Sequence, residues 1–379
     1  MNFTLSLIVP CYNEAQTIEI CVKKLLDFSK GQDFSLEIIT VDDASTDGSL
    51  QILERIAERH SEIKVLKHEK NRGKGAALRT GFIHASGDFV GIQDADDEYD
   101  PNDYSLMLEP MTNGKADVVY GSRYLLPDTR RVLYFWHTWM NKALTKVSNM
   151  FTNLDITDME TCYKLFRRDI IQKIAPQLKE ERFGFEPEIT ALAANAGCRV
   201  YECAISYNPR TYEEGKKIGW KDGMRALYCI FHYSAHRAPL PMQILIYLFI
   251  GTVSMLANMA FFISGNLAGL PLNYSITAAF ILAATVNYIL CVLILFKHNA
   301  RWKTPGELLL YGITITFMGS LDFGLTRLLM TLSGGLVLPK FIAATAGFAG
   351  NFLLRKWLVF PEKNRTKNLE LRTQKNQNS

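Results

Sequence analysis

The feature that most constrains this chain is a long segment without charged residues. Between Met242 and Phe296 there is no Asp, Glu, Lys or Arg, although these residues make up 21% of the 379-residue sequence. A segment inside a bilayer excludes charges because burying them in hydrocarbon is costly. The sequence therefore predicts one soluble part and one membrane-embedded part.

The membrane-embedded part contains four apolar runs, each near or above the ~20 residues that cross a bilayer as a helix. Four crossings return the chain to its starting side. We therefore expect a four-helix transmembrane domain over residues 241–361. The runs are Met242 to Ser264, Leu272 to Phe296, Leu308 to Leu332 and Leu338 to Phe360.

A short repeat lies within these runs. The segment that begins at Asn287 (NYIL) is matched by the segment that begins at Asn351 (NFLL), 64 positions later. The match favours two duplicated helical hairpins, with chance similarity between apolar segments as the alternative.

The charges that flank the runs predict their orientation. Lys and Arg are concentrated in Lys297–Lys303 and in the tail at 362–379, whereas the turns Gly265–Asn273 and Ser333–Val337 carry no charge. Basic loops stay in the cytoplasm. We expect the soluble part and both termini there, in a protein integral to the cell inner membrane. The run Phe3–Val9 is too short for a signal peptide and no basic residue precedes it.

The first 215 residues alternate short apolar runs with amphipathic segments. Such β-α-β units predict the α/β class with a Rossmann-like, mostly parallel sheet. Ligands bind beyond the carboxyl ends of such strands. The expected strands are Leu5–Pro10, Leu36–Val41, Ile63–His68, Phe89–Gln93 and Asp117–Tyr120, and the expected helices are Glu14–Phe28, Ser49–His60 and Gly75–Ala85.

Composition excludes several classes of protein. The seven cysteines are scattered without a C-x-x-C pair, which argues against a disulfide framework or a structural zinc site and fits a reducing cytoplasm. The net charge is only +4 and the basic residues form no stripe, so nucleic acid is not an expected partner.

Two clusters of polar residues follow the first two expected strands. Pro10, Tyr12 and Glu14 follow the first strand or end it, and Asp42 and Asp43 follow the second. Acidic and amide side chains at these ends can accept hydrogen bonds from a nucleobase or a ribose. Each cluster alone also fits a helix cap or a turn.

A third cluster carries paired carboxylates. Asp94 and Asp96 follow an apolar strand, next to Gln93, and can face one point beyond the strand end. Two carboxylates repel each other unless a cation lies between them. Mg²⁺ or Mn²⁺ bound together with a nucleotide diphosphate would remove this repulsion.

The fourth cluster is basic. Arg123 follows the fifth strand, Arg131 comes soon after it, and Arg210 and Lys217 precede the first apolar run. Arginine binds phosphate groups through two parallel hydrogen bonds. A solvated surface is the alternative for several of these residues.

The motifs together resemble a known family. SLIVPCYNE, VDDASTDGS, NRGKGAALRTGFIHASGDFVGIQDAD and VVYGSRY have the order and spacing of glycosyltransferase family 2. The sequence resembles its polyprenyl-phosphate glycosyltransferases, the dolichol-phosphate mannose synthase and dolichyl-phosphate glucosyltransferase group, over roughly residues 5 to 235. The last four runs resemble a GtrA-like domain, whose characteristic ending is matched by Asn351 to Phe360.

The resemblance implies a GT-A fold with assigned residue roles. The segment Glu160 to Lys164 departs from the mannose synthase pattern, which leaves the donor sugar open. The implied roles are nucleotide and donor binding by Pro10, Tyr12, Glu14, Asp42, Asp43, Gln93, Arg210 and Lys217, metal binding by Asp94 and Asp96, and acceptor-phosphate binding by Arg123 and Arg131.

The expected reaction is inverting transfer of a hexose (glucose, mannose or N-acetylhexosamine) from a UDP- or GDP-sugar to undecaprenyl or dolichyl phosphate at the cytoplasmic leaflet. The lipid phosphate is already ionised at neutral pH, so no general base is needed. One alternative is a processive polysaccharide synthase, but no Q-x-x-R-W motif is present. Another is a non-catalytic flippase or scaffold, against which Asp94 and Asp96 argue. A homo-oligomer formed through the membrane helices is left open.

The segment between the two parts mixes basic and aromatic residues. Lys216 to Arg237 contains Trp220 and Tyr228, so amphipathic interfacial helices are expected over residues 216–240. An ordinary helix docked on the soluble part is the alternative.

Overall fold

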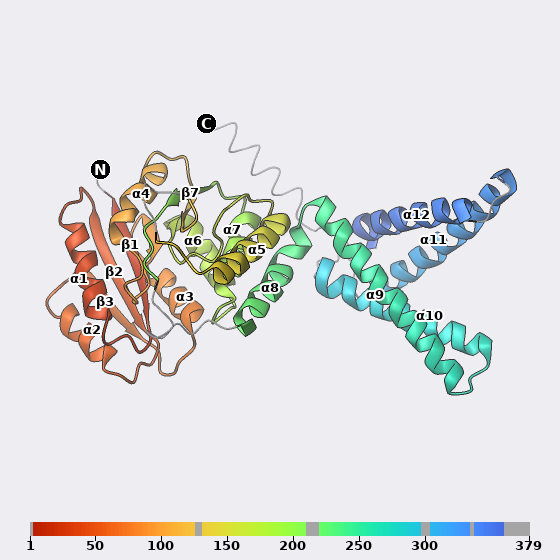
Figure 1. Ribbon diagram of the computed structural model, residues 1–379, viewed down its shortest axis with the longest axis horizontal. Helices are drawn as coiled ribbons and strands as arrows, with labels where there is room; N and C mark the ends of the chain where they lie inside the picture. Colours follow the sequence, from red (N-terminus) through yellow and green to blue (C-terminus); the bar gives the residue numbers. More distant parts are fainter. Residues whose placement is uncertain (1–2, 126–130, 210–219, 297–303, 334–336, 360–379) are drawn as a thin grey trace. The chain divides into compact units, whose positions relative to one another are not determined.

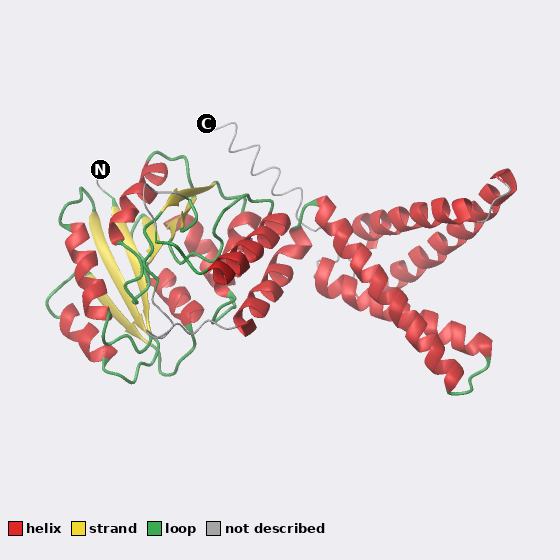
Figure 2. Cartoon of the chain, viewed as in Figure 1, coloured by secondary structure: helices red, strands yellow, loops and turns green. Residues whose placement is uncertain are grey.

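The computed structural model describes residues 3–125, 131–209, 220–296, 304–333 and 337–359. The chain divides into two units, Met1–Pro239 and Leu240–Ser379. All described strands belong to the first unit, and the described part of the second unit is helical (Figure 2).

The first unit is built on a seven-stranded sheet with the order β3-β2-β1-β4-β6-β5-β7. The four strands at one side are parallel neighbours, whereas β6 runs antiparallel to both β4 and β5. The predicted mostly parallel, Rossmann-like sheet is confirmed. The strands are β1 (Thr4–Cys11), β2 (Ser35–Asp42), β3 (Ile63–Lys67), β4 (Phe89–Ile92), β5 (Val118–Ser122), β6 (Lys164–Arg167) and β7 (Val200–Ala204).

Helices connect the strands and cover both faces of the sheet (Figure 1). The first helix begins at Ile18 and not at Glu14, because Glu14 to Thr17 form a turn in which the Thr17 N–H donates to the Glu14 carbonyl (3.0 Å). The helices are α1 (Ile18–Ser29), α2 (Ser49–Ala57), α3 (Lys74–His84), α4 (Tyr104–Thr112), α5 (Phe135–Thr152), α6 (Arg168–Ile174), α7 (Phe185–Asn195) and α8 (Trp220–Ser234).

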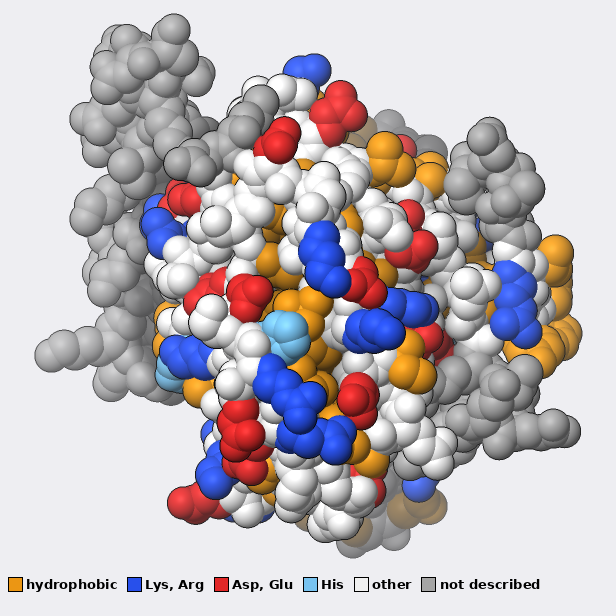
Figure 3. All heavy atoms as spheres, turned by 90° about the vertical axis from the view of Figure 1, so that its left-hand side faces the viewer, with side chains coloured by type: hydrophobic (Ala, Val, Ile, Leu, Met, Phe, Trp, Pro, Cys, Tyr) orange, Lys and Arg blue, Asp and Glu red, His pale blue; other side chains and the backbone are white. Residues whose placement is uncertain are grey.

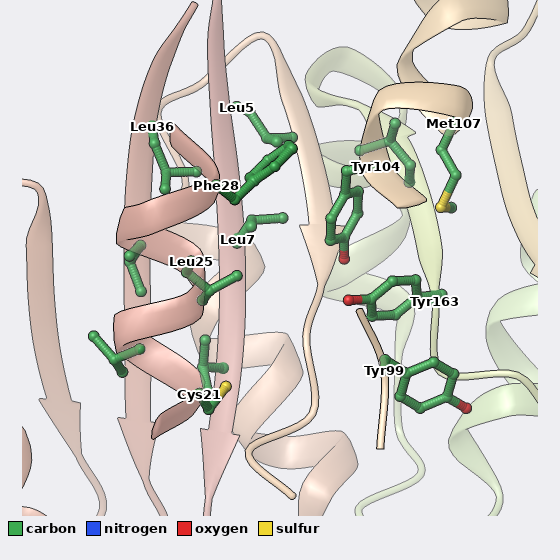
Figure 4. Packing of buried hydrophobic residues seen from close by; sticks show 14 of the residues in the cluster. Leu5, Leu7, Cys21, Leu25, Phe28, Leu36, Tyr99, Tyr104, Met107 and Tyr163 are labelled. Atoms are coloured by element: carbon green, nitrogen blue, oxygen red, sulfur yellow. The ribbon is translucent and has the colours of Figure 1, made fainter. Parts of the chain in front are cut away.

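The alternation of side chains along β1 divides the core into two layers. Leu5 and Leu7 point to the face covered by α1, where Leu25 and Phe28 are buried (Figure 4). Ile8 points to the opposite face and meets α3 at Gly81, where an added Cβ would lie 2.1 Å from Ile8 Cγ2. Both faces are therefore closely packed, as the parallel sheet requires.

The strand register brings the polar clusters to one edge of the sheet. Cys11 pairs with Asp42, so β1 and β2 end at the same level. Ile8 pairs with Ile92, and the Gln93 N–H donates to the Ile8 carbonyl (2.9 Å). The residues that follow β1, β2 and β4 therefore meet beyond neighbouring carboxyl ends.

The second unit consists of two helical hairpins. Helix α9 packs along α10, and α11 packs along α12. Among the described residues, α9 is the one helix long and apolar enough to cross a membrane by itself, and shorter apolar stretches lie at Ile281–Leu295 and Leu309–Met318. Four crossings therefore stay a prediction. The helices are α9 (Leu240–Leu267), α10 (Leu272–Leu290), α11 (Thr304–Ser333) and α12 (Val337–Leu354), with π-helical turns at Cys291–Phe296 and Arg355–Val359.

The two hairpins meet around a buried arginine. Arg355 donates from Nη1 to Asn287 Oδ1 and to Cys291 Sγ, the latter over 3.6 Å. The rings of Tyr247 and Tyr311 lie 5.5 and 4.7 Å from its guanidinium carbon. The two tyrosines are 64 positions apart, as are Cys291 and Arg355. This spacing, which the repeated asparagine motif shares, supports the duplication.

Helix α8 belongs to the first unit. It packs on α5 and α7, and the Arg225 guanidinium forms an ion pair with Glu180 (2.8 Å) that the Tyr233 hydroxyl supports (3.1 Å). Its other side exposes Met224 and Tyr228. Helix α8 therefore packs on the soluble part, which was the alternative expectation for this segment. A role at the membrane interface stays a prediction. The basic loop 297–303 and the tail 362–379 lie outside the described residues.

Candidate active site

The loops after β1 and β2 are tied to each other by side-chain hydrogen bonds. Asn13 has a left-handed backbone (φ 56°) and accepts the Thr46 N–H (2.8 Å). The Ala15 N–H donates to Asp47 (2.9 Å). Tyr12 directly precedes these contacts and is 46% exposed. An exposed ring on a fixed loop can stack on a nucleobase.

Pro10 and Glu14 flank this loop. Pro10 lies within β1 opposite Val41, at the last pair but one of the β1–β2 register. The Glu14 carboxylate accepts the hydroxyl of Thr17 (2.9 Å), and its N–H donates to Ser49 (2.9 Å). Both residues thus stand at the expected edge, and Glu14 also shapes the start of α1.

The two carboxylates after β2 differ in their partners. Asp42 accepts the Ser45 N–H through Oδ2 (3.1 Å), whereas its Oδ1 is buried without a hydrogen-bond partner within the described part of the chain. A buried acceptor without a donor is costly. Asp42 therefore keeps one unused acceptor, below the surface at the carboxyl end of β2.

Asp43 is engaged inside the protein. Its carboxylate accepts the backbone N–H groups of Arg72 (2.9 Å) and Gly73 (2.6 Å) and lies 2.7 Å from His68 Nδ1. The side chain is 2% exposed. Asp43 therefore contributes to the site through the loop that it holds before α3.

This loop requires glycine where it passes residue 181. Gly73 has a φ of 95°, and a Cβ at this position would lie 2.3 Å from the Glu181 carbonyl oxygen. The Gly75 N–H donates to the same carbonyl (2.9 Å). The backbone on both sides of Lys74 is therefore fixed, and only the Lys74 side chain retains freedom.

A pair of tyrosines supports the end of β4. The Tyr104 hydroxyl donates to the Ile92 carbonyl (2.6 Å), and the Tyr163 hydroxyl donates to Gln93 Oε1. The two rings lie 4.8 Å apart (Figure 4). Gln93 is buried and its amide is used within the protein. It therefore supports the turn that presents Asp94 and does not face solvent.

Asp94 meets a cation in the protein itself. The Lys74 ammonium lies 2.7 Å from Asp94 Oδ1, donates to Cys162 Sγ (2.8 Å) and lies 3.9 Å from Glu186 Oε1. Burial is the largest influence and by itself would raise the pKa of Asp94, but the charges of Lys74 and Lys164 and the hydrogen bonds from Cys162 and Lys74 together lower the pKa below its ordinary value. Asp94 is therefore ionised at neutral pH.

The pair Asp94 and Asp96 fits a metal that is shared with a substrate. Asp96 is partly exposed and accepts the Glu98 N–H (3.2 Å). Among the side chains that the structure describes, no group of three or more His, Cys, Asp or Glu could hold a metal alone. Mg²⁺ is usually bound by one or two carboxylates together with substrate phosphates. Asp94 and Asp96 at the end of β4 would provide such a half-site, and their metal binding stays a prediction.

The predicted acceptor residues lie beyond β5. Arg123 forms two parallel hydrogen bonds with Asp158 (2.7 and 2.8 Å), and both side chains are buried. Its guanidinium carbon lies 5.2 Å from the centre of the Tyr207 ring. Arg131 is exposed and donates to the Pro209 carbonyl (3.1 Å). Both arginines thus contact the segment after β7. The predicted donor ligands Arg210 and Lys217 lie outside the described residues.

Several residues of this region were not predicted from the sequence. Asp158 has no periodic signal, whereas Lys74 stands between two glycines at a strand-to-helix loop, which marks a close approach of the backbone. Glu160 is a further, partly exposed acid whose Oε1 is buried and has no partner among the described groups. Burial and the nearby Glu186 raise its pKa to about 8.

Each unit matches a described protein family. Residues 6–175 match glycosyl transferase family 2, which covers the sheet edge with Asp42, Asp94 and Asp96. Residues 246–360 match the GtrA/DPMS transmembrane domain. The second unit is therefore a domain of membrane proteins.

Similar proteins support the first match. Dolichyl-phosphate beta-glucosyltransferase ALG5D of Trichomonas vaginalis is 30% identical over 216 residues, which cover 54% of this chain and 65% of that protein. Dolichyl-phosphate beta-glucosyltransferase of Dictyostelium discoideum is 30% identical over 237 residues, 57% of this chain and 69% of that protein. The match thus spans about two thirds of these relatives.

A solved mannosyltransferase from Pyrobaculum calidifontis, in complex with GDP-Man and Mn²⁺, is similar at 20% identity with a TM-score of 0.45, covering 94% of this chain and 88% of that one. The assignment of this chain to a family does not depend on the Pyrobaculum structure. It follows from the 30% identity to the Dictyostelium protein over 69% of that protein's length. This chain belongs to glycosyl transferase family 2.

Proposed function

We propose that this protein transfers a hexose from a UDP- or GDP-sugar to a polyprenyl phosphate, with inversion at the sugar carbon. The observation that carries the proposal is the sheet edge beyond β1, β2 and β4. There Asp42 has an unused carboxylate oxygen and Asp94 is held ionised close to Asp96 in sequence. The names of the similar glucosyltransferases support dolichyl phosphate or a related lipid phosphate as acceptor.

The donor side would bind the nucleotide at the rim and the diphosphate at the centre. Tyr12 would stack on the base, and Asp42 would accept a hydrogen bond from the base or the ribose. Asp94 and Asp96 would hold Mg²⁺ or Mn²⁺ together with the diphosphate. A bound metal of this kind takes up charge that develops on the departing diphosphate.

The acceptor side would be organised by the two arginines. Asp158 holds the Nε and Nη2 edge of Arg123, so the guanidinium plane has one orientation and the Nη1 edge would face an incoming phosphate. Arg131 would add a second positive charge from the surface. An ionised phosphate oxygen needs positioning and no proton acceptor, so no histidine or carboxylate base has to be assigned.

The start of α5 supports contact with a lipid surface. Val132, Phe135, Trp136 and Trp139 are 88%, 69%, 75% and 54% exposed and directly follow Arg131. Exposed aromatic residues next to a basic residue are typical of segments that lie in the headgroup layer. On the face of the molecule in Figure 3, by contrast, charges of both signs are interspersed, as on a solvated surface.

We infer that the lipid surface is the cytoplasmic leaflet of the cell inner membrane, with both termini in the cytoplasm. The basic residues in 297–303 and 362–379 support this orientation. Self-association through the membrane helices stays a prediction.

The test is an assay of the full chain in lipid vesicles with labelled UDP- and GDP-sugars, polyprenyl phosphate, and Mn²⁺ or chelator. A chloroform-soluble product that mild acid hydrolyses is the expected result, and it should require the divalent metal. A long polymer would indicate a processive synthase instead. No turnover with any donor would contradict the proposed transfer and favour a flippase or scaffold.

A further inference from the structure

The strongest unexplained feature is the position of the Lys74 ammonium. It occupies the space beside the metal-binding carboxylate Asp94, at 2.7 Å, with Cys162 and Glu186 as its other neighbours. Its side chain is 32% exposed, so the charge lies at the border between the interior and the open edge of the site. The Lys74 charge thus lies where it partly neutralises the carboxylate that a divalent metal would need.

Hydrogen bonds hold the backbone on both sides of Lys74. Asp43 binds the N–H groups of Arg72 and Gly73, and Gly75 is bound to the Glu181 carbonyl (2.9 Å). Lys74 is also the first residue of α3. The Cα position is therefore fixed, and the ammonium can leave Asp94 only by rotation of its four-carbon side chain.

Two cations at this point repel each other. A divalent ion on Asp94 and Asp96 would come within a few ångströms of the ammonium, and the repulsion at such a distance is several times larger near a protein surface than in bulk water. A nucleotide diphosphate changes this balance, because its oxygens can bind the metal and the ammonium together. Asp94 and Asp96 have no third protein ligand beside them among the described side chains, which also favours metal binding together with a diphosphate.

We propose that Lys74 is the resident counter-cation of Asp94, which weakens metal binding until a nucleoside diphosphate arrives and then pairs with that diphosphate. The inference rests on the proposed function and adds an order to it. Metal and diphosphate bind together. In the empty site the Lys74 charge balances that of Asp94, and a metal ion without diphosphate would be repelled by Lys74. Lys74 acts as a positioning residue for the metal.

The experiment measures binding of Mn²⁺ to the full chain by the electron paramagnetic resonance signal of free Mn²⁺, without nucleotide and with UDP or GDP. Lys74→Gln keeps a hydrogen-bond donor beside Asp94 and removes the charge. We expect this variant to bind Mn²⁺ alone at least ~10-fold more tightly than the wild type. The added nucleotide should then increase the affinity less than in the wild type.

Two variants act as controls. Lys74→Arg retains the charge and should behave like the wild type. Lys24→Gln removes an ammonium that lies 2.7 Å from Asp97 on the surface, where the side chain is 48% exposed, and should change the Mn²⁺ affinity by less than about twofold. If Lys74→Gln unfolds, Lys74→Met serves as the second neutral variant.

Equal Mn²⁺ affinity of the wild type and the neutral variants without nucleotide would overturn the role of Lys74. If Mn²⁺ still binds with UDP or GDP in that case, the proposed transfer reaction stands. If no protein binds Mn²⁺ under any condition, the proposed metal use fails together with the role of Lys74.

Discussion

The ends of β2 and β4 both carry acidic residues, but the carboxylates at the two ends are bound by different kinds of group. At β2, Asp43 is bound by backbone N–H groups, which cannot leave without unfolding the loop. At β4, Asp94 is bound by the side chain of Lys74, which can rotate away. The comparison indicates that a carboxylate held by backbone groups maintains structure, whereas one held by a side chain can exchange its partner for a ligand.

The ends of β2 and β4 are also linked by a chain of consecutive contacts. Asp43 holds Gly73, Gly73 positions Lys74, and Lys74 reaches Asp94. A change at β2 should therefore affect stability first and the β4 site second. A change at β4 should affect chemistry with little effect on stability.

The largest expected effect separates the two ends most clearly. Asp96→Ala removes a proposed metal ligand that is partly exposed, so we expect activity to fall on the order of 10³-fold while the melting temperature stays within about 2 °C. The measurement is sugar transfer together with thermal unfolding of the full chain. Asp27→Ala, at an exposed ion pair on α1, is the control and should leave activity unchanged. Full activity of Asp96→Ala would remove the metal role.

Asp43→Ala tests the β2 end. The substitution leaves two buried backbone N–H groups without their charged acceptor, and we expect a loss of about 3 kcal/mol in the free energy of unfolding. Activity should fall as well, because Lys74 loses its fixed position. Denaturant unfolding of the full chain measures the first effect. A variant with wild-type stability and reduced activity would show that Asp43 contacts the ligand directly.

Gly73→Ala tests the link between the two ends. A methyl group would meet the Glu181 carbonyl, and the φ of 95° is itself unfavourable, so a loss of about 2 kcal/mol is expected. Gly114→Ala is the matched control, since its φ is 67° but no atom lies within 4 Å of an added Cβ. The difference in melting temperature between the two variants measures the close approach together with the less favourable backbone conformation of Gly73 (φ 95°, ψ 164°). Equal destabilisation would mean that the loop can move away from residue 181.

The last prediction concerns the pH dependence of stability at Glu160, whose Oε1 has no hydrogen-bond partner among the described residues. Its pKa is raised to about 8 by burial and by Glu186, above the ordinary value of 4.5, so the folded protein holds a proton that the unfolded chain releases. The folded state therefore loses stability as the pH rises from about 4.5 to 8. Glu160→Gln should remove this loss and melt at a higher temperature than the wild type at pH 8, with little difference at pH 5.

Thermal unfolding of both proteins from pH 5 to 8 provides the measurement. Glu54→Gln, on the exposed side of α2, should show no such dependence on pH. A difference between Glu160→Gln and the wild type that is constant over this range would contradict a raised pKa.

The sequence allowed the parallel half of the sheet and its polar edge to be predicted. The first four strands are β-branched runs followed directly by acidic or turn residues, so both the strands and the positions of Asp42 and Asp94 could be located. The antiparallel strand β6 was missed, because its four residues place a lysine and an arginine around only two apolar side chains. The short β7 was missed as well.

Asp158 and Cys162 could not be predicted as site residues because the strand that follows them, β6, was not predicted. The segment before β6 supplies Asp158 to Arg123 and Cys162 to Lys74, over 35 and 88 positions of sequence. Such contacts depend on where the chain enters the sheet, which no local pattern encodes. The aromatic start of α5 was missed for another reason. The basic and aromatic residues of 216–240 show the same pattern and favour that segment as interfacial, although α8 packs one side against α5 and α7.

The junction of the membrane hairpins has a consequence for how such a duplicated domain can change. Cys291 and Arg355 occupy equivalent positions of the two copies, and their side chains touch at 3.6 Å. Two guanidinium groups at that separation, away from water, would repel strongly. Under the predicted duplication, the arginine would therefore be restricted to one copy, and the two hairpins would have to differ at this position.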